Sequence, residues 1–394
     1  MLENNKYISI NMIDKHLSFI IFSLLMFGMV MVYSARLHLP EDFHRQIFWD
    51  QMGGHPFHVL LGITTIFIFI LIPSNLLKEI SGVIFGFGIF LLLMVAFRQM
   101  TGGPDVILDG AVRSISLGKL SFQPAEFMKL FSLLFASAYA VRRKDRINET
   151  LFHGIAPIGF LMIVIMTLLL YQPDLGSTFV ITTSVIIVLF LGGMSLKVIL
   201  AVISILGIFF ILMVVSTEWR LTRLLSYWDP CAQEYFHSAG YQLCNALAAF
   251  GHGGLLGTGL GIGSAKLGHL PLPHTDFIFS VIGEELGFFG VVLILFAFSF
   301  IFVRAILIGR EAMSKEKIFS GLLAQGIGVW LGLQTLIHTG VNTGLLPTKG
   351  LTLPFISYGG SSMIIVCAAV GILFRIDLEN KALISSFKKH KQKK

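Results

Sequence analysis

Residues 271–287, PLPHTDFIFSVIGEELG, place four ionisable side chains at the start of, and then inside, a hydrophobic stretch that continues to about residue 308. They are His274, Asp276, Glu284 and Glu285. A charge at the centre of a membrane helix costs roughly 2.5–3.5 kcal/mol on insertion scales. Ionisable groups in such positions usually line a polar cavity or take part in chemistry. The stretch therefore predicts a membrane protein that carries a polar site.

The composition predicts the same class of protein. Of the 394 residues, 55% are hydrophobic and 13% are charged, whereas soluble domains are about 25% charged. Since one span needs about 20 apolar residues, roughly ten spans are predicted. They lie near residues 16–34, 57–73, 81–97, 124–141, 155–171, 177–194, 197–215, 277–308, 318–343 and 357–376. We predict an all-α, polytopic integral membrane protein with a large outer loop, residues 216–276, before the eighth span.

One membrane domain is predicted over residues 16–376, between an N-terminal segment, residues 1–15, and a basic tail, residues 377–394. Lys and Arg gather in short loops such as residues 142–146, and in the tail. Because Lys and Arg favour the cytoplasmic side, both termini are predicted to be cytoplasmic. The net charge of +7 then reflects these cytoplasmic segments, and we expect no nucleic-acid partner.

The outer loop holds a glycine-rich run at residues 251–263 and two cysteines. The run fits no nucleotide-binding pattern, since no Gly-Lys-Ser/Thr follows and no strand precedes it. We expect a re-entrant or surface loop whose glycines supply backbone freedom. A disulfide between Cys231 and Cys244 is left open. Cys367, in the last span, is expected to pack as a small apolar residue.

Cationic side chains reach the outer side from separate segments. Arg113 lies in the first outer loop, and Lys349 precedes the small-residue run at 357–362. Arg220 and Arg223 are three residues apart, so a helix would put both on one face. Arginine suits phosphate oxygens because its planar fork binds them through two hydrogen bonds. The alternative for this arginine pair is to anchor lipid headgroups at the membrane edge.

Three further positions have two interpretations each. Lys129 follows Glu126 by three residues, and an internal ion pair is the alternative to substrate binding. Asp174, in QPDLG at 172–176, suits a helix cap as well as a ligand. Adjacent helical residues point about 100° apart, so at most one of Glu284 and Glu285 should face the cavity of Asp276. We favour Glu285.

Several cations with one carboxylate suit an anionic, lipid-attached substrate. The cations would hold a pyrophosphate, and Asp276 would take a proton from an attacking hydroxyl. This chemistry predicts a group-transfer site on the outer half of the membrane.

Five segments together resemble the SEDS (shape, elongation, division, sporulation) family of bacterial peptidoglycan polymerases. They are QPAEFMK (123–129), QPDLG (172–176), HTDFIF (274–279), GEELG (283–287) and PTKGLTLPFISYGGSS (347–362). The match runs in order along nearly the whole chain. Within the family, TKGLTL (348–353), GYQL (240–243) and AFG (249–251) are more similar to the division members than to the elongation members.

The resemblance implies a ten-span glycosyltransferase that joins lipid II into glycan strands on the outer face of the bacterial inner membrane, at the division septum. It would release undecaprenyl pyrophosphate and work with a class B penicillin-binding protein and other division proteins. Asp276 would be the catalytic base. Where the family often has Arg-Trp, this chain has Arg113-Ser114, which leaves a role for Arg113 but none for an aromatic residue at 114.

The candidate substrate-binding residues extend beyond the cations. They are Arg113, Lys129, Arg220, Arg223, Lys349, Glu285, His274 and Ser361. No cofactor is evident and no cluster has metal-ligand spacing, so we expect no protein-bound metal, while a divalent cation at the leaving pyrophosphate is left open.

Two other classes of function are alternatives. A transporter that flips lipid II would also place carboxylates within its spans, but the sequence shows no inverted repeat or pair of broken helices. A non-catalytic division scaffold would tolerate Asp276→Asn, whereas a polymerase would not.

Overall fold

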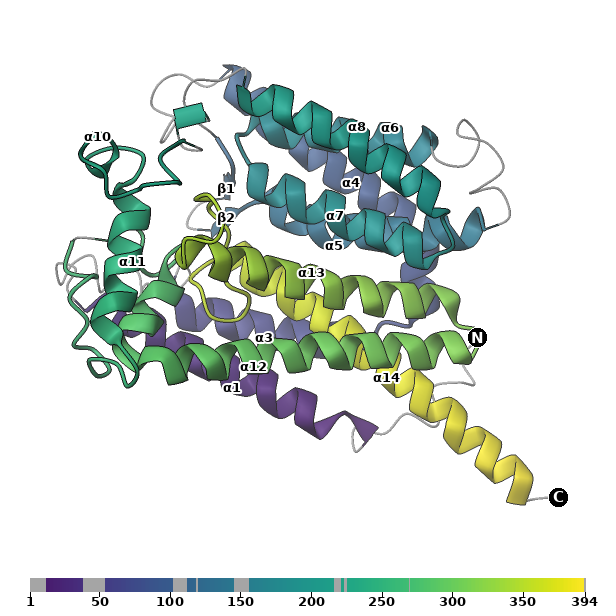
Figure 1. The fold of residues 1–394 in the computed structure, drawn as a ribbon. Coiled ribbons are helices and arrows are strands. Elements are labelled where there is room, and N and C mark those ends of the chain that lie inside the picture. Colours follow the sequence, from purple (N-terminus) through teal and green to yellow (C-terminus); the bar gives the residue numbers. More distant parts are fainter. Residues whose placement is uncertain are drawn as a thin grey trace.

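The computed structural model describes residues 12–37, 54–101, 112–117, 120–144, 156–215, 221–222, 225–268 and 270–392. Long helices run alongside one another and form a bundle (Figure 1). These helices are α1 (Lys15–Ser34), α3 (His55–Leu71), α4 (Ser74–Thr101), α5 (Pro124–Arg142), α6 (Ala156–Tyr171), α7 (Leu175–Leu191), α8 (Leu196–Val215), α12 (Ile278–Ser314), α13 (Ile318–Asn342) and α14 (Gly360–Gln392).

Each predicted span coincides with one of these helices, and the all-α fold class is confirmed. Among the described residues, five helices are long and apolar enough to cross a membrane, namely α1, α4, α12, α13 and the part of α14 up to residue 382. Four shorter apolar helices accompany them: α3, α6, α7 and part of α8. The number of crossings stays a prediction. Helix α14 also continues beyond the predicted last span, into the basic tail.

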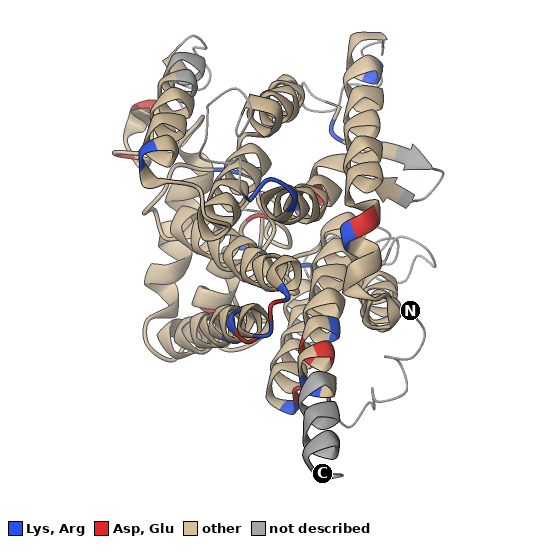
Figure 2. Ribbon diagram, turned by 90° about the vertical axis from the view of Figure 1, so that its right-hand side faces the viewer, with Lys and Arg blue, Asp and Glu red and all other residues tan. Residues whose placement is uncertain are grey.

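The outer face of the bundle is apolar, as a protein surrounded by lipid requires. Phe19, Val83 and Leu293 are 72%, 76% and 69% exposed, and charged side chains are few along the helices (Figure 2). Helix α13 is the most buried of the five long apolar helices after α14, and its Trp330 is fully buried. A solvent-facing surface would not expose so many large apolar side chains without a partner.

The smaller elements gather at one end of the bundle, opposite the projecting end of α14 (Figure 1). Strands β1 (Ile115–Leu117) and β2 (Leu120–Phe122) pair antiparallel, with Ile115 opposite Phe122. Helices α10 (Gln233–Phe236) and α11 (Tyr241–Gly253) belong to the large outer loop. This loop contains a disulfide between Cys231 and Cys244, whereas Cys367 is free and buried.

Helix α12 is broken near its start, which explains its excess length over one crossing. Gly287 has φ 65° and ψ −164°, outside the helical region. The carbonyls of Glu284 and Glu285, which the break leaves without helical partners, accept hydrogen bonds from Thr258 and Gly259 of the glycine-rich run, at 2.9 and 3.0 Å. A broken helix at membrane depth needs such partners, because lipid offers none.

The glycine-rich run approaches this break more closely than any side chain would allow. Gly257 has φ 80°, and a Cβ there would lie 2.2 Å from the carbonyl oxygen of Glu285. The run therefore forms a loop, as the sequence predicts, and it supplies main-chain hydrogen bonds to the broken helix.

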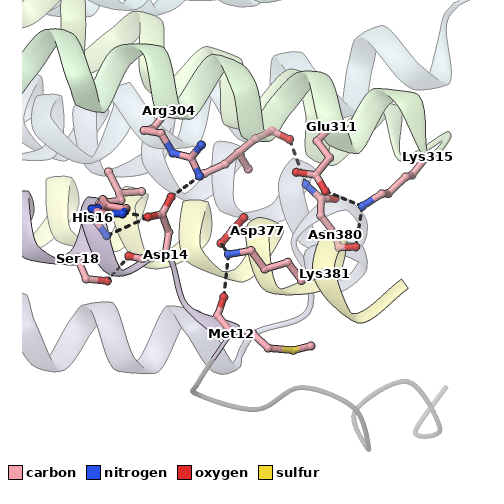
Figure 3. A network of polar contacts seen from close by, with 12 residues as sticks. Met12, Asp14, His16, Ser18, Arg304, Glu311, Lys315, Asp377, Asn380 and Lys381 are labelled. Atoms are coloured by element: carbon pink, nitrogen blue, oxygen red, sulfur yellow. Dashed lines mark hydrogen bonds and ion pairs between the residues drawn. The ribbon is translucent and has the colours of Figure 1, made fainter. Parts of the chain in front are cut away.

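At the end of the bundle away from the hairpin, an ion pair and a hydrogen bond join three segments (Figure 3). Asp14 caps α1 by accepting from the amides of His16 and Leu17, and its carboxylate also pairs with Arg304 of α12. Lys381 of α14 donates to the carbonyl of Met12 at 2.8 Å. These contacts fasten the start of α1 to α12 and α14.

Candidate active site

A cavity of about 380 Å³ lies at the end of the bundle that carries the β-hairpin. Four segments line it: the first turn of α3, the hairpin with the start of α5, the loop before α12, and the loop that leads into α14. The described lining residues are His58, Ser121, Gln123, Glu126, Leu272, Thr275, Asp276, Thr352, Tyr358, Gly359, Gly360, Ser361 and Ser362. The cavity therefore contains Asp276 and Ser361 among the residues predicted from the sequence.

The backbone around Asp276 is held by its neighbours. The Asp276 carbonyl accepts from the side-chain amide of Asn342 at 2.9 Å. The carbonyl of Thr275 accepts from the Ser357 hydroxyl at 2.7 Å. Asp276 itself is half-buried, and a Cβ at Gly350 would lie 3.0 Å from its Oδ2. The carboxylate of Asp276 thus lies beside Gly350 of the 347–362 segment, and its backbone is held by Asn342 and Ser357.

Ser361 connects the hairpin to the start of α14. Its hydroxyl accepts from the amide of Gln123 at 3.0 Å and donates to the carbonyl of Ser121 at 3.2 Å. Nearby, the hydroxyls of Thr352 and Ser362 lie 2.7 Å apart. Neutral hydroxyls and main-chain amides of this kind suit the hydroxyl groups of a sugar.

Lys129 forms the internal ion pair that was the alternative to substrate binding. Its Nζ lies 2.6 Å from Oε1 of Glu126 and donates to Oε1 of Gln334 at 3.2 Å. Lys129 is not among the lining residues, but Glu126 is. The other oxygen of Glu126, Oε2, is buried and has no hydrogen-bond partner among the described residues. Helix α5 thus brings a second carboxylate, rather than a cation, to the cavity.

Glu285 does not face the cavity of Asp276, contrary to the expectation from the sequence. It is paired with Lys266 at 2.5 Å and accepts from the Ser34 hydroxyl at 2.8 Å. Glu284 accepts from the amide of Ser264 at 2.8 Å. The two side chains do diverge as helical neighbours should, but both bind the glycine-rich run and its flank, because that run closes the break in α12.

Arg113, Lys349 and Asp174 are not among the described lining residues of the cavity. Arg113 is exposed and donates from Nε to the carbonyl of Gln172 at 3.2 Å, and Lys349 is half-buried in the segment beside Asp276. Asp174 caps α7 by accepting from the amide of Ser177 at 2.9 Å. The predicted pair Arg220 and Arg223 lies outside the described residues.

His274 packs beside the cavity rather than in it. Its ring centroid lies 5.9 Å from that of Tyr358, and the amide of Tyr358 donates to its carbonyl at 2.9 Å. Burial, with the nearby charge of Arg36, lowers the pKa of His274 to about 3. The imidazole is therefore neutral at physiological pH and acts as a dipole, not as a cation.

A family model of cell cycle proteins, FtsW/RodA/SpoVE, matches residues 15–382, which include every long helix of the bundle, α14 as far as residue 382. The chain belongs to the FtsW/RodA/SpoVE family. The resemblance seen in the five sequence motifs is thereby confirmed, and so is a multi-pass membrane protein.

Individual relatives agree with this FtsW/RodA/SpoVE assignment. The chain is 43% identical over 359 residues to a probable peptidoglycan glycosyltransferase FtsW of Nitrosomonas europaea, covering 91% of each chain. It is 38% identical to the protein of the same name from Legionella pneumophila, covering 94% of this chain and 92% of that one.

Solved FtsW/RodA/SpoVE-like structures share the fold. A chain from a study of how a peptidoglycan synthase complex coordinates polymerization and crosslinking matches with a TM-score of 0.74 and 27% identity, over 93% of this chain and 98% of that one. The rod shape determining protein RodA of Thermus thermophilus matches with a TM-score of 0.63 and 27% identity, over 93% and 96%.

The sequence analysis missed several side chains of this candidate site. His58 and Tyr358 line the cavity, and Arg36 and His55 pack against Tyr358 behind it. A signal was present, since two histidines three residues apart at the start of an apolar helix are as unusual as the carboxylates of α12. Among the described residues, no group of three or more His, Cys, Asp or Glu side chains could hold a metal ion.

Proposed function

We infer that this protein is a peptidoglycan glycosyltransferase that polymerises lipid II into glycan strands during septal cell-wall synthesis. The observation that carries the inference is the carboxylate of Asp276, which lines a cavity of about 380 Å³ beside the hydroxyls of Thr352, Ser361 and Ser362. The curated relatives that bear the name peptidoglycan glycosyltransferase FtsW support it over most of the chain.

In the proposed reaction, a sugar hydroxyl of the acceptor attacks the anomeric carbon of the donor. The bond between that carbon and the pyrophosphate oxygen breaks, and undecaprenyl pyrophosphate leaves with the bonding electrons. Asp276 takes the proton of the attacking hydroxyl as general base, a role that contributes about 10²–10⁴-fold in rate. The contacts to Asn342 and Ser357 hold the Asp276 segment in position for this step.

The proposal includes a divalent cation that enters with the substrate. Magnesium is commonly held by one or two carboxylates together with substrate phosphates and water. Asp276 and Glu126 are the two carboxylates among the described lining residues, and Oε2 of Glu126 has no protein partner. These two groups would share the cation with the pyrophosphate of the bound lipid.

The proposed setting is the bacterial inner membrane at the septum, with both termini cytoplasmic. The distribution of Lys and Arg supports this orientation, and the basic tail would lie near anionic lipid. We further propose that the protein works with a class B penicillin-binding protein and other division proteins. The likeness to a chain from a study of a peptidoglycan synthase complex supports such a partner.

The test is polymerisation of labelled lipid II by the purified protein with its crosslinking partner, whose transpeptidase site is blocked. The control variant is Asp229→Asn, because Asp229 is an exposed carboxylate of the outer loop. The wild type and this control should both give a ladder of glycan products. Asp276→Asn should give none at a normal membrane level. If neither the wild type nor the variant makes glycan while labelled lipid II crosses proteoliposome membranes, the protein is a flippase and the proposal is wrong.

A further inference from the structure

Four basic side chains surround Tyr358 next to the cavity. We call Arg36, His55, His58 and His274 the Arg-His cluster. The ring centroids of the three histidines lie 5.8, 5.9 and 5.9 Å from that of Tyr358. The guanidinium carbon of Arg36 lies 4.1 Å from the same ring centroid. The proposed reaction does not use any member of this cluster.

The cluster contains an unusual number of buried polar atoms without partners. Among the described residues, no hydrogen-bond partner is found for Nε and Nη1 of Arg36, both ring nitrogens of His55, and Nδ1 of His58 and His274. Arg36 is 1% exposed and His55 is 0% exposed. More than nine in ten buried polar groups in folded proteins are paired with protein or water, so these atoms are available to hydrogen-bond a ligand.

A ligand of this cluster should be an anion, because Arg36 is positively charged and its partner among the described residues is the Tyr358 side chain, not a carboxylate. Burial lowers the pKa of Arg36 to about 10, so its guanidinium stays protonated at neutral pH. Within the described part of the chain, no carboxylate forms an ion pair with Arg36. A buried, uncompensated guanidinium is costly unless something anionic binds to it.

The start of α3 adds to the same positive potential. His55 and His58 lie in its first turn, and the preceding Gly54 provides no side-chain cap. Pro56 supplies no amide N–H in this turn, but the dipole at a helix start still favours an anion. His58 and Tyr358 also line the cavity that contains Asp276. An anion held by the cluster could therefore belong to the same molecule as the groups bound in that cavity.

We propose that the Arg-His cluster is an anion subsite that takes a phosphoryl group of a polyprenyl-linked substrate bound in the Asp276 cavity. The identity of the substrate rests on the proposed function, whereas the anion subsite rests on the cluster itself. Lipid II also carries carboxylates, on its peptide. We favour the phosphoryl group over these carboxylates because α3 offers lipid-facing apolar residues close to the subsite. Leu60 is 60% exposed just after His58, and Phe67 is 62% exposed further along. A phosphoryl group is bonded directly to the polyprenyl chain that would run along this face.

The first test measures binding of undecaprenyl phosphate and of undecaprenol to the purified full-length protein in nanodiscs. The wild type should bind the phosphate about tenfold to a hundredfold more tightly than the alcohol, which is the range of a charge-assisted hydrogen bond. Arg36→Gln should lose this preference while it still binds the alcohol. Arg142→Gln, whose side chain donates to the carbonyl of Lys78 on another part of the bundle, should keep it.

Comparing two ligands on one variant separates loss of the subsite from partial unfolding, since misfolding would weaken both. His55→Gln provides a second variant for the same comparison. If Arg36→Gln and His55→Gln keep the full preference for the phosphate, the subsite proposal is wrong.

The second test measures kcat/KM for lipid II polymerisation, with free and with amidated peptide carboxylates. Arg36→Gln should lower kcat/KM about tenfold or more on both substrates, and Arg142→Gln should not. A loss confined to the substrate with free carboxylates would assign the subsite to the peptide and overturn our proposal. If the wild type makes no glycan but Arg36→Gln still loses the preference for phosphate, the anion subsite stands and the proposed function falls.

Discussion

The Nζ of Lys266 lies 2.5 Å from Oε1 of Glu285, and both side chains are fully buried. The Ser34 hydroxyl donates to the same carboxylate, and the amide of Gly261 does so at 3.1 Å. This one carboxylate therefore joins the end of α1, the glycine-rich run and the short first part of α12. Its role is to hold the outer end of the bundle together, next to the segment that carries Asp276.

Glu285→Gln should destabilise the fold strongly, because it leaves the charge of Lys266 buried and unpaired. Removing one partner of a buried ion pair typically costs about 3–5 kcal/mol. Unfolding in detergent, followed by circular dichroism, measures the loss. Glu311→Gln is the matched control, since its pair with Lys315 is partly exposed and worth about 0–1 kcal/mol. Equal stability of the two variants would show that the ion pair between Lys266 and Glu285 does not hold the outer end of the bundle together.

Gly257→Ala should also destabilise the fold, because it forces a Cβ against the broken helix. The φ of 80° is strained for alanine, and the new Cβ would meet the carbonyl oxygen of Glu285 at 2.2 Å. We expect a loss of about 1–3 kcal/mol or more. Gly82→Ala, in α4, has nothing within 4 Å of its new Cβ and should stabilise by about 0.5–1 kcal/mol. Thermal unfolding of both variants checks the contrast, and a neutral Gly257→Ala would contradict it.

Glu126→Gln should reduce both stability and polymerisation. It leaves Lys129 buried without its ion-pair partner, at a cost of about 3–5 kcal/mol, and removes one of the two carboxylates from the described lining of the cavity. Combining it with Lys129→Met should restore most of the stability, because no charge is then left unpaired, but not the activity. A stable and fully active double variant would mean that the carboxylate serves only to balance Lys129.

The stability of the protein should fall as the pH is lowered, partly because of His274. Its folded pKa is about 3, below the ordinary value of 6.5, so only the unfolded state takes up the proton between these values. Stability is therefore lost as the pH falls below 6.5, by about 2 kcal/mol at pH 5. His274→Gln should lose less stability than the wild type between pH 8 and pH 5, by about this amount, in unfolding measured at both pH values. Parallel pH profiles would exclude His274 as the cause.

The helices could be read from the sequence because length and hydrophobicity are local properties. The predicted spans 16–34 and 318–343 became Lys15–Ser34 and Ile318–Asn342. The third span was predicted to begin at residue 81, but its helix begins at Ser74. The polar side chains of this first turn find hydrogen-bond partners elsewhere in the fold, as Ser74 does with Glu379. Such contacts across 305 residues leave no trace in a hydrophobicity pattern.

The sequence alone determined that the chain is a helical membrane protein and which family it belongs to, because the order of motifs and the length of apolar stretches are local properties. It also predicted that Asp276 and Ser361 lie together, and both line one cavity. Only the tertiary structure decided what the other charges do. It paired Lys129 with Glu126 and Glu285 with Lys266, and it brought Arg36 over Tyr358. Electrostatic partners are chosen by distance in space, and in an environment of low dielectric constant a buried charge depends on the partner that the fold places beside it.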